Sequence, residues 1–254
     1  MSRLGFVKRR PDVPPTFYAV EAAGLRWLGG VQGGARMATV LAVTDETITV
    51  ERVEQEAPTL AAALTLGRAL ATTHAAGAPA YGCPPGDWTG DGFIGPLPLP
   101  HHACETFGEF FGAYRLAPFV RQLHDAGTID AGERLLFDRV VDRLATGVIG
   151  GPSEPPSRVH GDLWNGNVLW GRRGAVLIDP AAHGGHRESD LAMLALFGLP
   201  YLDPLLAAYG EVHPLAEGWR KRVGLHQLYP LLVHGVLFGR SYAQRALTIA
   251  GQYF

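Results

Sequence analysis

The sequence has only two cysteines, two lysines and no long hydrophobic run. Cys83 and Cys104 lie in unlike contexts and lack metal-ligand spacing, so neither a disulfide framework nor a cysteine-based zinc site is expected. No stretch is apolar over the length that a membrane-spanning helix needs. The first residues, Met1–Phe6, lack the apolar run and cleavage site of a signal peptide. These absences predict a cytoplasmic protein in a reducing compartment.

Charge is also scarce and nearly balanced. The formal net charge of −2 gives no electrostatic reason to expect nucleic acid or an anionic membrane as a partner. The hydrophobic fraction of 47% allows a sizeable core, so the 254 residues predict one large domain or two small ones that share a cleft. Almost all basic residues are arginine, as expected of a GC-rich bacterial genome. Lys8 therefore stands out, because arginine and lysine are not interchangeable.

The pattern of expected elements changes near residue 56. Before it we expect a strand at 5–8, a helix that starts after Thr16 as its N-cap and ends at Gly29, and strands at 37–43 and 47–53. After it we expect helices over 59–76, 105–125 and 129–146, a long loop over 77–102, strands at 168–170 and 175–178, and helices from 187 to 253 broken at Pro200, Pro204 and Pro214. The expected fold class is α+β, with a small lobe (residues 1–56) and a helical lobe (residues 57–254). A cleft between two lobes is a common nucleotide site.

The segment from 158 to 179 carries the strongest chemical signal. Asp162 follows His160-Gly161, Asn167 comes five residues later, and Asp179 ends the next apolar strand. Phosphotransferases of the protein-kinase type use this spacing: the first Asp receives the proton of the attacking hydroxyl, and the Asn and second Asp hold the metal. We therefore expect an ATP-dependent kinase with Asp162 as catalytic base and Asn167 and Asp179 as Mg²⁺ ligands.

Each of these residues also has an ordinary alternative. Asp162 could cap a neighbouring amide, and Asn167 could be a turn residue in Asn-Gly-Asn. The chemistry favours function, because a poorly acidic hydroxyl needs a carboxylate in hydrogen-bond reach and Mg²⁺ prefers oxygen ligands. His160 can brace the turn at Asp162. Trp164 could stack on a sugar or, equally, pack in the core.

Lys8 and Glu21 form a second candidate pair. A lysine on a small-lobe strand can reach the α and β phosphates, and a glutamate on the following helix can orient it as an ion pair. Glu21 shares a helix face with Phe17 and Leu25 and is expected to point inward. The alternative is a surface lysine and an exposed glutamate.

Four ionisable residues follow the second Asp: His183, His186, Glu188 and Asp190. A zinc site is conceivable, but the spacing matches no common zinc pattern and the metal of phosphoryl transfer prefers oxygen. We expect Glu188 and Asp190 instead to cap the next helix or to brace the catalytic loop.

Taken together, these motifs resemble the fructosamine kinase (ketosamine 3-kinase) family, which belongs with the aminoglycoside phosphotransferases and choline kinases. The resembling segments are 6–8, 21–25, 160–167, 178–193 and 225–239. Gly-Asp-Leu-Trp-x-Gly-Asn and Gly-Gly-His-Arg-Glu-x-Asp-Leu are much more specific to this family than His-Gly-Asp alone. The resemblance implies a protein-kinase-like fold with a small antiparallel-sheet N-lobe and a mostly helical C-lobe.

The resemblance also implies a reaction: ATP- and Mg²⁺-dependent phosphorylation of the 3-hydroxyl of a ketosamine, a sugar attached to a small amine or to a protein lysine, as deglycation repair. Lys8 would clamp the phosphates with Glu21 as its partner, and Glu51 and Val53 would meet the adenine at the hinge. Family members carry a glycine-rich loop upstream of this lysine. No Gly-x-Gly-x-x-Gly precedes Lys8 in this sequence, so the small lobe is expected to lack it.

Two other functions stay open. A kinase for another hydroxyl acceptor, such as an aminoglycoside or an amino alcohol, would use the same chemistry, but an aminoglycoside cleft needs many carboxylates and residues 77–104 offer only Asp87 and Asp91. A nucleotide-binding pseudokinase would account for the missing glycine loop but not for a complete set of Asp162, Asn167 and Asp179. The sequence indicates neither the oligomeric state nor which ketosamine is used.

Overall fold

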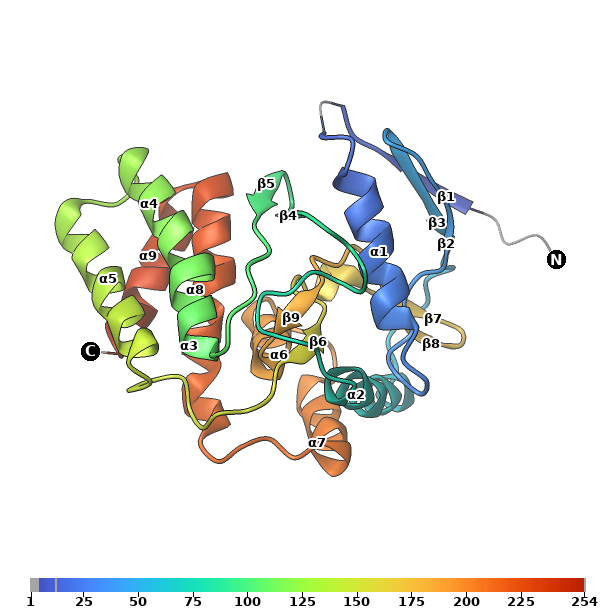
Figure 1. Cartoon of the computed structure of the whole chain (residues 1–254). Helices are drawn as coiled ribbons and strands as arrows, with labels where there is room; N and C mark the ends of the chain where they lie inside the picture. The colour runs from blue at the N-terminus through green and yellow to red at the C-terminus, as the bar shows by residue number, and fades with distance from the viewer. Residues whose placement is uncertain (1–4, 12, 254) are drawn as a thin grey trace.

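A computed structural model describes residues 5–11 and 13–253 (Figure 1). A three-stranded sheet and one helix form the N-terminal part: β1 (Gly5–Arg9), α1 (Phe17–Gly29), β2 (Val40–Val43) and β3 (Thr47–Glu51). The order is β1-β3-β2, with β3 antiparallel to both neighbours. These four elements were predicted, and Thr16 is the N-cap residue of α1 as predicted, although its side chain makes no capping bond. Residues 1–4, on which the signal-peptide prediction partly rests, lie outside the described residues.

The rest of the chain is mainly helical, and its strands form three short antiparallel pairs. The helices are α2 (Leu60–Ala75), α3 (Phe107–Glu109), α4 (Ala117–Asp125), α5 (Ala131–Ala145), α6 (Arg187–Leu196), α7 (Leu202–Val212), α8 (Trp219–Phe238) and α9 (Arg240–Ala250), with a π-helical segment η1 (Phe110–Leu116) and a 3₁₀ turn η2 (Asn165–Asn167). The pairs are β4 (Gly92–Ile94) with β5 (Leu97–Leu99), β6 (Ser157–Val159) with β9 (His183–Gly185), and β7 (Val168–Gly171) with β8 (Gly174–Leu177). The predicted α+β class is confirmed.

Three local predictions are wrong. The segment 77–102, expected to be a loop, contains the β4–β5 hairpin, and strands β6 and β9 were not expected at all. All four of these strands have only three residues, which is too few for an alternating pattern to be recognised in the sequence. Pro204 does not break the helices but lies in the first turn of α7, where a missing N–H leaves no intrahelical acceptor unpaired.

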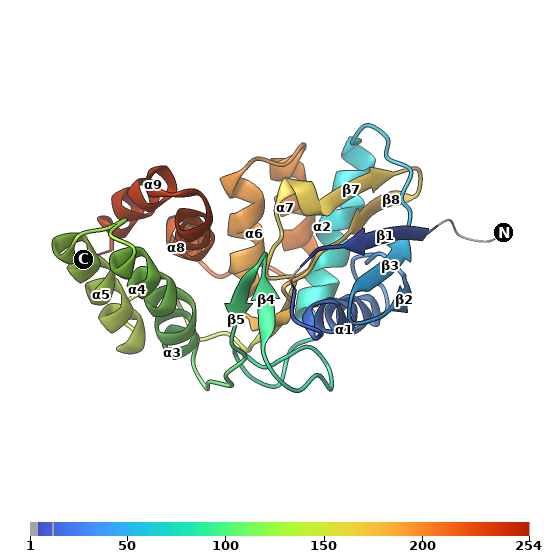
Figure 2. The same ribbon diagram turned by 90° about the horizontal axis from the view of Figure 1, so that it is seen from above.

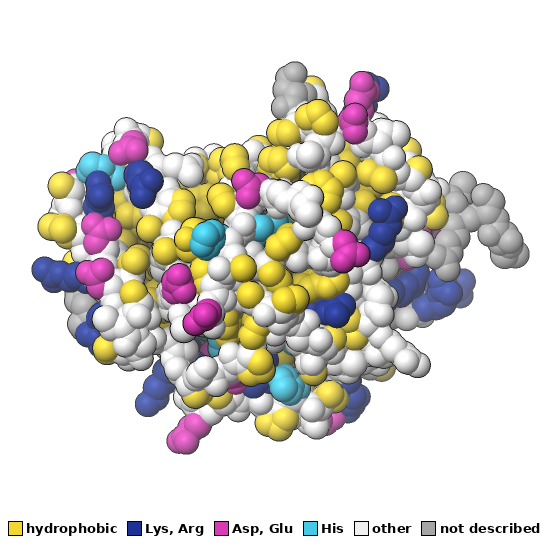
Figure 3. Space-filling view, in the orientation of Figure 1, with side chains coloured by type: hydrophobic (Ala, Val, Ile, Leu, Met, Phe, Trp, Pro, Cys, Tyr) yellow, Lys and Arg dark blue, Asp and Glu magenta, His cyan; other side chains and the backbone are white. Residues whose placement is uncertain are grey.

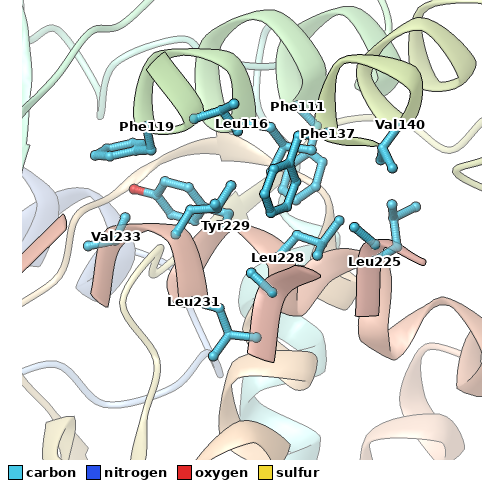
Figure 4. Close-up of a cluster of buried hydrophobic side chains, with 14 of the residues drawn as sticks. Phe111, Leu116, Phe119, Phe137, Val140, Leu225, Leu228, Tyr229, Leu231 and Val233 are labelled. Carbon is cyan, nitrogen blue, oxygen red and sulfur yellow. The ribbon is translucent and has the colours of Figure 1, made fainter. Parts of the chain in front are cut away.

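One hydrophobic cluster holds the C-terminal helices together. Phe119 and Phe137 extend from α4 and α5 toward Leu225, Leu228 and other side chains of α8, and all four are buried (Figure 4). Fully burying one such side chain stabilises the fold by about 1.5–3 kcal/mol. This packed group of helices is a rigid support on one side of the molecule, and the β4–β5 hairpin lies between it and the remaining elements (Figure 2).

A second cluster joins the small sheet to the helical part. It runs from Leu28 on α1 and Ile48 on β3 through Leu66 on α2 to Val176 on β8 and Leu191 on α6. Because this core contains residues on both sides of the expected division at 56–57, the lobe boundary stays a prediction. Within residues 5–11 and 13–253, no helix is both long and apolar enough to cross a bilayer. The predicted location also stays a prediction.

Candidate active site

A cavity of about 790 Å³ opens between the small sheet, α1, the β4–β5 hairpin and the β7–β8 region. Most of the predicted site residues line it: Lys8, Glu21, Glu51, Val53, Asp162, Trp164, Asn167 and Asp179. The other three, His160, Glu188 and Asp190, are not among its lining residues. Residues from distant parts of the sequence are thus brought to one cleft.

The turn at His160-Gly161-Asp162 is fixed by short-range contacts. Gly161 has a φ of 78°, and a Cβ there would lie 2.2 Å from the carbonyl oxygen of Ala181, so only glycine fits. His160 donates from Nε2 to the carbonyl of Ile178 (2.9 Å), and its Nδ1 accepts from the N–H of Asp162 (3.3 Å). Burial lowers the pKa of His160, which keeps the imidazole neutral, as this pair of bonds requires.

Asp190 also holds the turn at His160-Gly161-Asp162 in place. Its carboxylate accepts hydrogen bonds from the N–H groups of His160 (2.7 Å) and Gly161 (3.0 Å) and lies 3.1 Å from Nε2 of His74. Burial acts to raise the pKa of Asp190, but the hydrogen bonds from His74 and the turn outweigh it and leave the pKa lowered. Asp190 therefore braces the turn as an anion. His74, whose Nδ1 meets the hydroxyl of Tyr209 (2.9 Å), was missed, because nothing in the Ala-rich helix sequence marks it.

The three residues of the central motif converge. Asn167, at the end of η2, donates from its amide nitrogen to the backbone carbonyl (2.8 Å) and the carboxylate (3.1 Å) of Asp162. This leaves the Oδ1 atom of Asn167 for another ligand. Asp179 follows β8 with a φ of 55°, a conformation that is strained for a residue other than glycine and that is often found at functional sites.

Asp162 has the electrostatics of a base that works near neutral pH. Burial raises its pKa to about 7; the hydrogen bond from Asn167 opposes the rise, and the charges of Asp179 and Asp190 add to it. Because a base is most effective when its pKa lies near the working pH, this environment suits proton abstraction from a hydroxyl.

The parameter kcat/KM for ATP reports the protonation state of the free enzyme. We expect it to fall by about tenfold per pH unit below about pH 7. The sign follows from the raised pKa: as the pH falls through 7, Asp162 takes up a proton and can no longer accept one. Initial rates measured between about pH 5 and 9 test this. A profile that stays flat on the acid side would exclude Asp162 as the titrating base.

Lys8 bridges the two carboxylates nearest to it. Its Nζ donates to Glu21 (2.5 Å) and to Asp179. Burial acts to lower the pKa of Lys8, but the charges of Glu21 and Asp179 outweigh it, so the pKa is raised and the side chain is a cation. Lys8 lies opposite Ile48 in the antiparallel pair of β1 and β3, and this pairing fixes the position of the strand that carries Lys8. A fixed cation beside Asp179 is well placed to meet phosphate oxygens.

The other end of the cavity is less polar. Val50, Val53, Leu169 and Ile178 line it together with Glu51, the last residue of β3. The carboxylate of Glu51 is buried and accepts a hydrogen bond from Arg36 (2.7 Å). Arg36 was not predicted as a site residue, because its segment has no motif.

Trp164 lies at the mouth of the cavity and is 40% exposed. Its indole covers Gly166, where a Cβ would lie 2.3 Å from the ring, so a glycine at 166 is needed for this position of the ring. The ring is in T-shaped contact with Phe197 at 6.1 Å between centroids. Of the two interpretations of Trp164, exposure beside Asp162 favours a contact with substrate.

Glu188 lies away from the catalytic turn. Its carboxylate accepts two hydrogen bonds from Arg222 (2.6 and 2.9 Å), which joins α6 to α8 rather than bracing the loop. Ligand atoms of His186, Glu188 and His226 lie within 4.8 Å of one another. Because the Arg222 cation already occupies both oxygens of Glu188, we assign no metal to this group.

The residues of the cleft fit a magnesium ion by their chemistry. The free Oδ1 of Asn167 and the carboxylate of Asp179, 42% exposed, are both oxygen ligands on the cavity wall. Mg²⁺ usually takes one or two carboxylate or amide oxygens and completes its shell with waters and phosphate oxygens. Two protein ligands beside a cation that can bind phosphate are consistent with that pattern.

The same fold occurs in known phosphotransferases. An ADP-bound aminoglycoside phosphotransferase is 14% identical to this chain and superposes with a TM-score of 0.63 over 98% of this chain and 88% of that one, a likeness in fold alone. Together with this fold, a match to the fructosamine kinase family model defines an ATP-dependent phosphotransferase that acts on a hydroxyl.

The chain belongs to the fructosamine kinase family, whose sequence model matches residues 2–254. A "probable ketoamine kinase" of Enterococcus faecium is 31% identical over 252 residues, which cover 96% of this chain and 85% of that protein. The chloroplastic protein-ribulosamine 3-kinase of Arabidopsis thaliana is 32% identical over 201 residues, 74% of this chain and 56% of that protein. A crystal structure titled "putative fructosamine-3-kinase", from Thermobifida fusca, is 49% identical with a TM-score of 0.90 and covers 97% of this chain and 84% of that one. The predicted family is confirmed.

Proposed function

We propose that this protein transfers the γ-phosphoryl group of Mg·ATP to the 3-hydroxyl of a ketosamine, either a small fructosamine or ribulosamine or a glycated protein. The observation that carries the proposal is the convergence of Asp162, Asn167, Asp179 and Lys8 in one cavity. Membership in the fructosamine kinase family supports the choice of acceptor.

The proposed transfer needs one base and one set of cationic contacts. The carboxylate of Asp162 receives the hydroxyl proton while the hydroxyl oxygen bonds to the γ phosphorus and the bond to the β–γ bridging oxygen breaks, releasing ADP. Lys8, oriented by Glu21, binds phosphate oxygens. Mg²⁺ held by Asn167 and Asp179 would supply positive charge to the phosphate oxygens when bound. Asp190 keeps the turn in place through its bonds to His160 and Gly161.

The adenine ring is proposed to lie at the apolar end of the cavity. The backbone of Glu51 and Val53 would supply hydrogen bonds to its edge, and Leu169 and Ile178 would contact its face. The ion pair of Glu51 with Arg36 joins the end of β3 to the segment before β2. With the adenine at this end, the triphosphate would extend toward Lys8 and Asp179.

The charges of the cavity favour a ketosamine over an aminoglycoside. Four of the lining residues are acidic, and of these Glu21 and Asp179 are paired with Lys8 and Glu51 is paired with Arg36. An acceptor with several ammonium groups would need more unpaired carboxylates than Asp162 alone can offer. A ketosamine carries a single amine beside its sugar and makes no such demand.

The test is a phosphorylation assay on ribulosamine, fructosamine, aminoglycoside and amino-alcohol acceptors with Mg·ATP. We expect transfer to a ketosamine, with ³¹P NMR placing the phosphate on the 3-oxygen, and loss of transfer when the metal is chelated. A 3-deoxy ketosamine is the matched control and should not react. Transfer to an aminoglycoside alone, or to a different hydroxyl, would contradict the proposal.

A further inference from the structure

A row of rings extends outward from the active site across three helices. Trp164 contacts Phe197, just after α6, at 6.1 Å between centroids, and Phe197 contacts His234 on α8 at 5.0 Å. His234 in turn contacts Phe238 at 5.4 Å and Tyr242 on α9 at 5.1 Å. We call these five residues the aromatic strip.

The strip lies at the surface rather than in the core. Phe238 is 65% exposed and Trp164 is 40% exposed, and the three rings between and beside them are only partly buried. On the face drawn in Figure 3, hydrophobic side chains also gather beside the β4–β5 hairpin. Folding gains little from a phenylalanine left in water, and contiguous exposed apolar surface commonly marks a binding site.

The strip is continuous with the catalytic cleft at Trp164, and the end of α8 also comes close to the cleft beside the β4–β5 hairpin. Trp164 lines the cavity together with Asp162. Gly95, at the turn of the β4–β5 hairpin, also lines it, and a methyl group there would lie 3.8 Å from Leu237, the residue before Phe238. The hairpin and the end of α8 therefore meet at the cleft, and a molecule that leaves the cleft past Trp164 runs onto the strip.

The middle of the strip also offers a polar atom. Nδ1 of His234 lies 2.7 Å from the carbonyl of Pro230 and must donate to it. In the neutral imidazole, Nε2 is then an acceptor, available to an amide or hydroxyl group. Rings with an occasional hydrogen-bond acceptor suit an apolar chain that contains amides.

Resting on the proposed function, we propose that the aromatic strip binds the amine carrier of the ketosamine, and that the carrier is apolar or aromatic. A ketosamine has a sugar at one end, which must lie at Asp162 for transfer, and an amine substituent at the other. The single ammonium between them would lie near Trp164 and Phe197, and aromatic faces attract cations. The carrier beyond the ammonium then contacts His234, Phe238 and Tyr242.

The test compares two adducts of one sugar, made with ethanolamine and with 4-phenylbutylamine, whose chain can carry a ring from Phe197 past His234 to Phe238. We expect kcat/KM at least tenfold higher for the phenylbutylamine adduct, with the difference in KM rather than kcat. In Phe238→Ser this preference should fall at least fivefold, since the exposed ring at the end of the strip is lost. Leu135→Ser, an equally exposed apolar residue on α5 (58%), is the matched control and should keep the full preference.

A measurement of binding in the absence of phosphoryl transfer tests the aromatic strip independently of the proposed reaction. Calorimetry of both adducts in the absence of ATP should show the same preference in Kd, lost in Phe238→Ser and kept in Leu135→Ser. If neither adduct is phosphorylated but the preference in Kd is lost in Phe238→Ser, the proposed reaction is wrong and the aromatic strip is still supported as the carrier site. Equal Kd values for both adducts, or a preference unchanged in Phe238→Ser, would overturn the strip as the carrier site.

Discussion

Asp162→Asn is expected to lower kcat by about 10²–10⁴-fold, the contribution of a positioned general base. The variant cannot accept the proton of the attacking hydroxyl, although it keeps the size of Asp162 and an oxygen to accept the bond from Asn167 (3.1 Å). The fold should not suffer. Because the pKa of Asp162 is raised to about 7, its ionised form is disfavoured in the folded state, and a neutral amide removes that cost.

Steady-state rates and melting temperatures of the variant test both parts of this expectation. The melting temperature at neutral pH should be unchanged or higher, and KM for ATP should change little. Asp203→Asn, at an exposed position in the first turn of α7, is the matched control and should behave as the parent protein. Near-normal turnover in Asp162→Asn would remove the assignment of the base.

Asp190→Ala should be strongly destabilising as well as inactivating. It removes the acceptor for two N–H groups of the catalytic turn and the partner of His74, and it leaves all three without a substitute. A donor left without a partner costs about 1–3 kcal/mol, so the loss of all three bonds to Asp190 costs at least about 3–5 kcal/mol. For a chain of this length that is a fall of roughly 6–20 °C in melting temperature.

Calorimetry or circular dichroism measures the fall, and kcat should decrease together with it because the turn that carries Asp162 is no longer held. Asp142→Ala, on the exposed face of α5, is the control and should change the free energy of unfolding by less than about 0.5 kcal/mol. An Asp190→Ala protein that melts normally would show that the brace is dispensable.

The sequence was sufficient for the chemistry because that chemistry is local in sequence. Asp162, Asn167 and Asp179 lie within 18 positions and are joined by one turn and one short strand pair, so their spacing nearly fixes their geometry. Lys8 and Glu21 were predicted from a strand and helix whose apolar faces were clear. These positions stay proposals for function, but the structure brings them together.

What the sequence did not indicate depends on contacts between distant segments. His74 reaches Asp190 from 116 positions away, and Arg36 reaches Glu51 from the loop before β2. The β4–β5 hairpin was missed because prolines and glycines in 77–102 predict a loop, although tertiary packing pairs Phe93 with Phe17 at 5.2 Å. The aromatic strip is likewise assembled from separate elements and has no linear motif.

The most direct measurement is the position of a metal ion. Mn²⁺ bound with a non-hydrolysable ATP analogue can be located in crystals by its anomalous scattering. The proposed function predicts a peak in the cleft with Oδ1 of Asn167 and a carboxylate oxygen of Asp179 at bonding distance, and the γ phosphate facing Asp162. An ion bound elsewhere, or an analogue whose phosphates point away from these three residues, would contradict it.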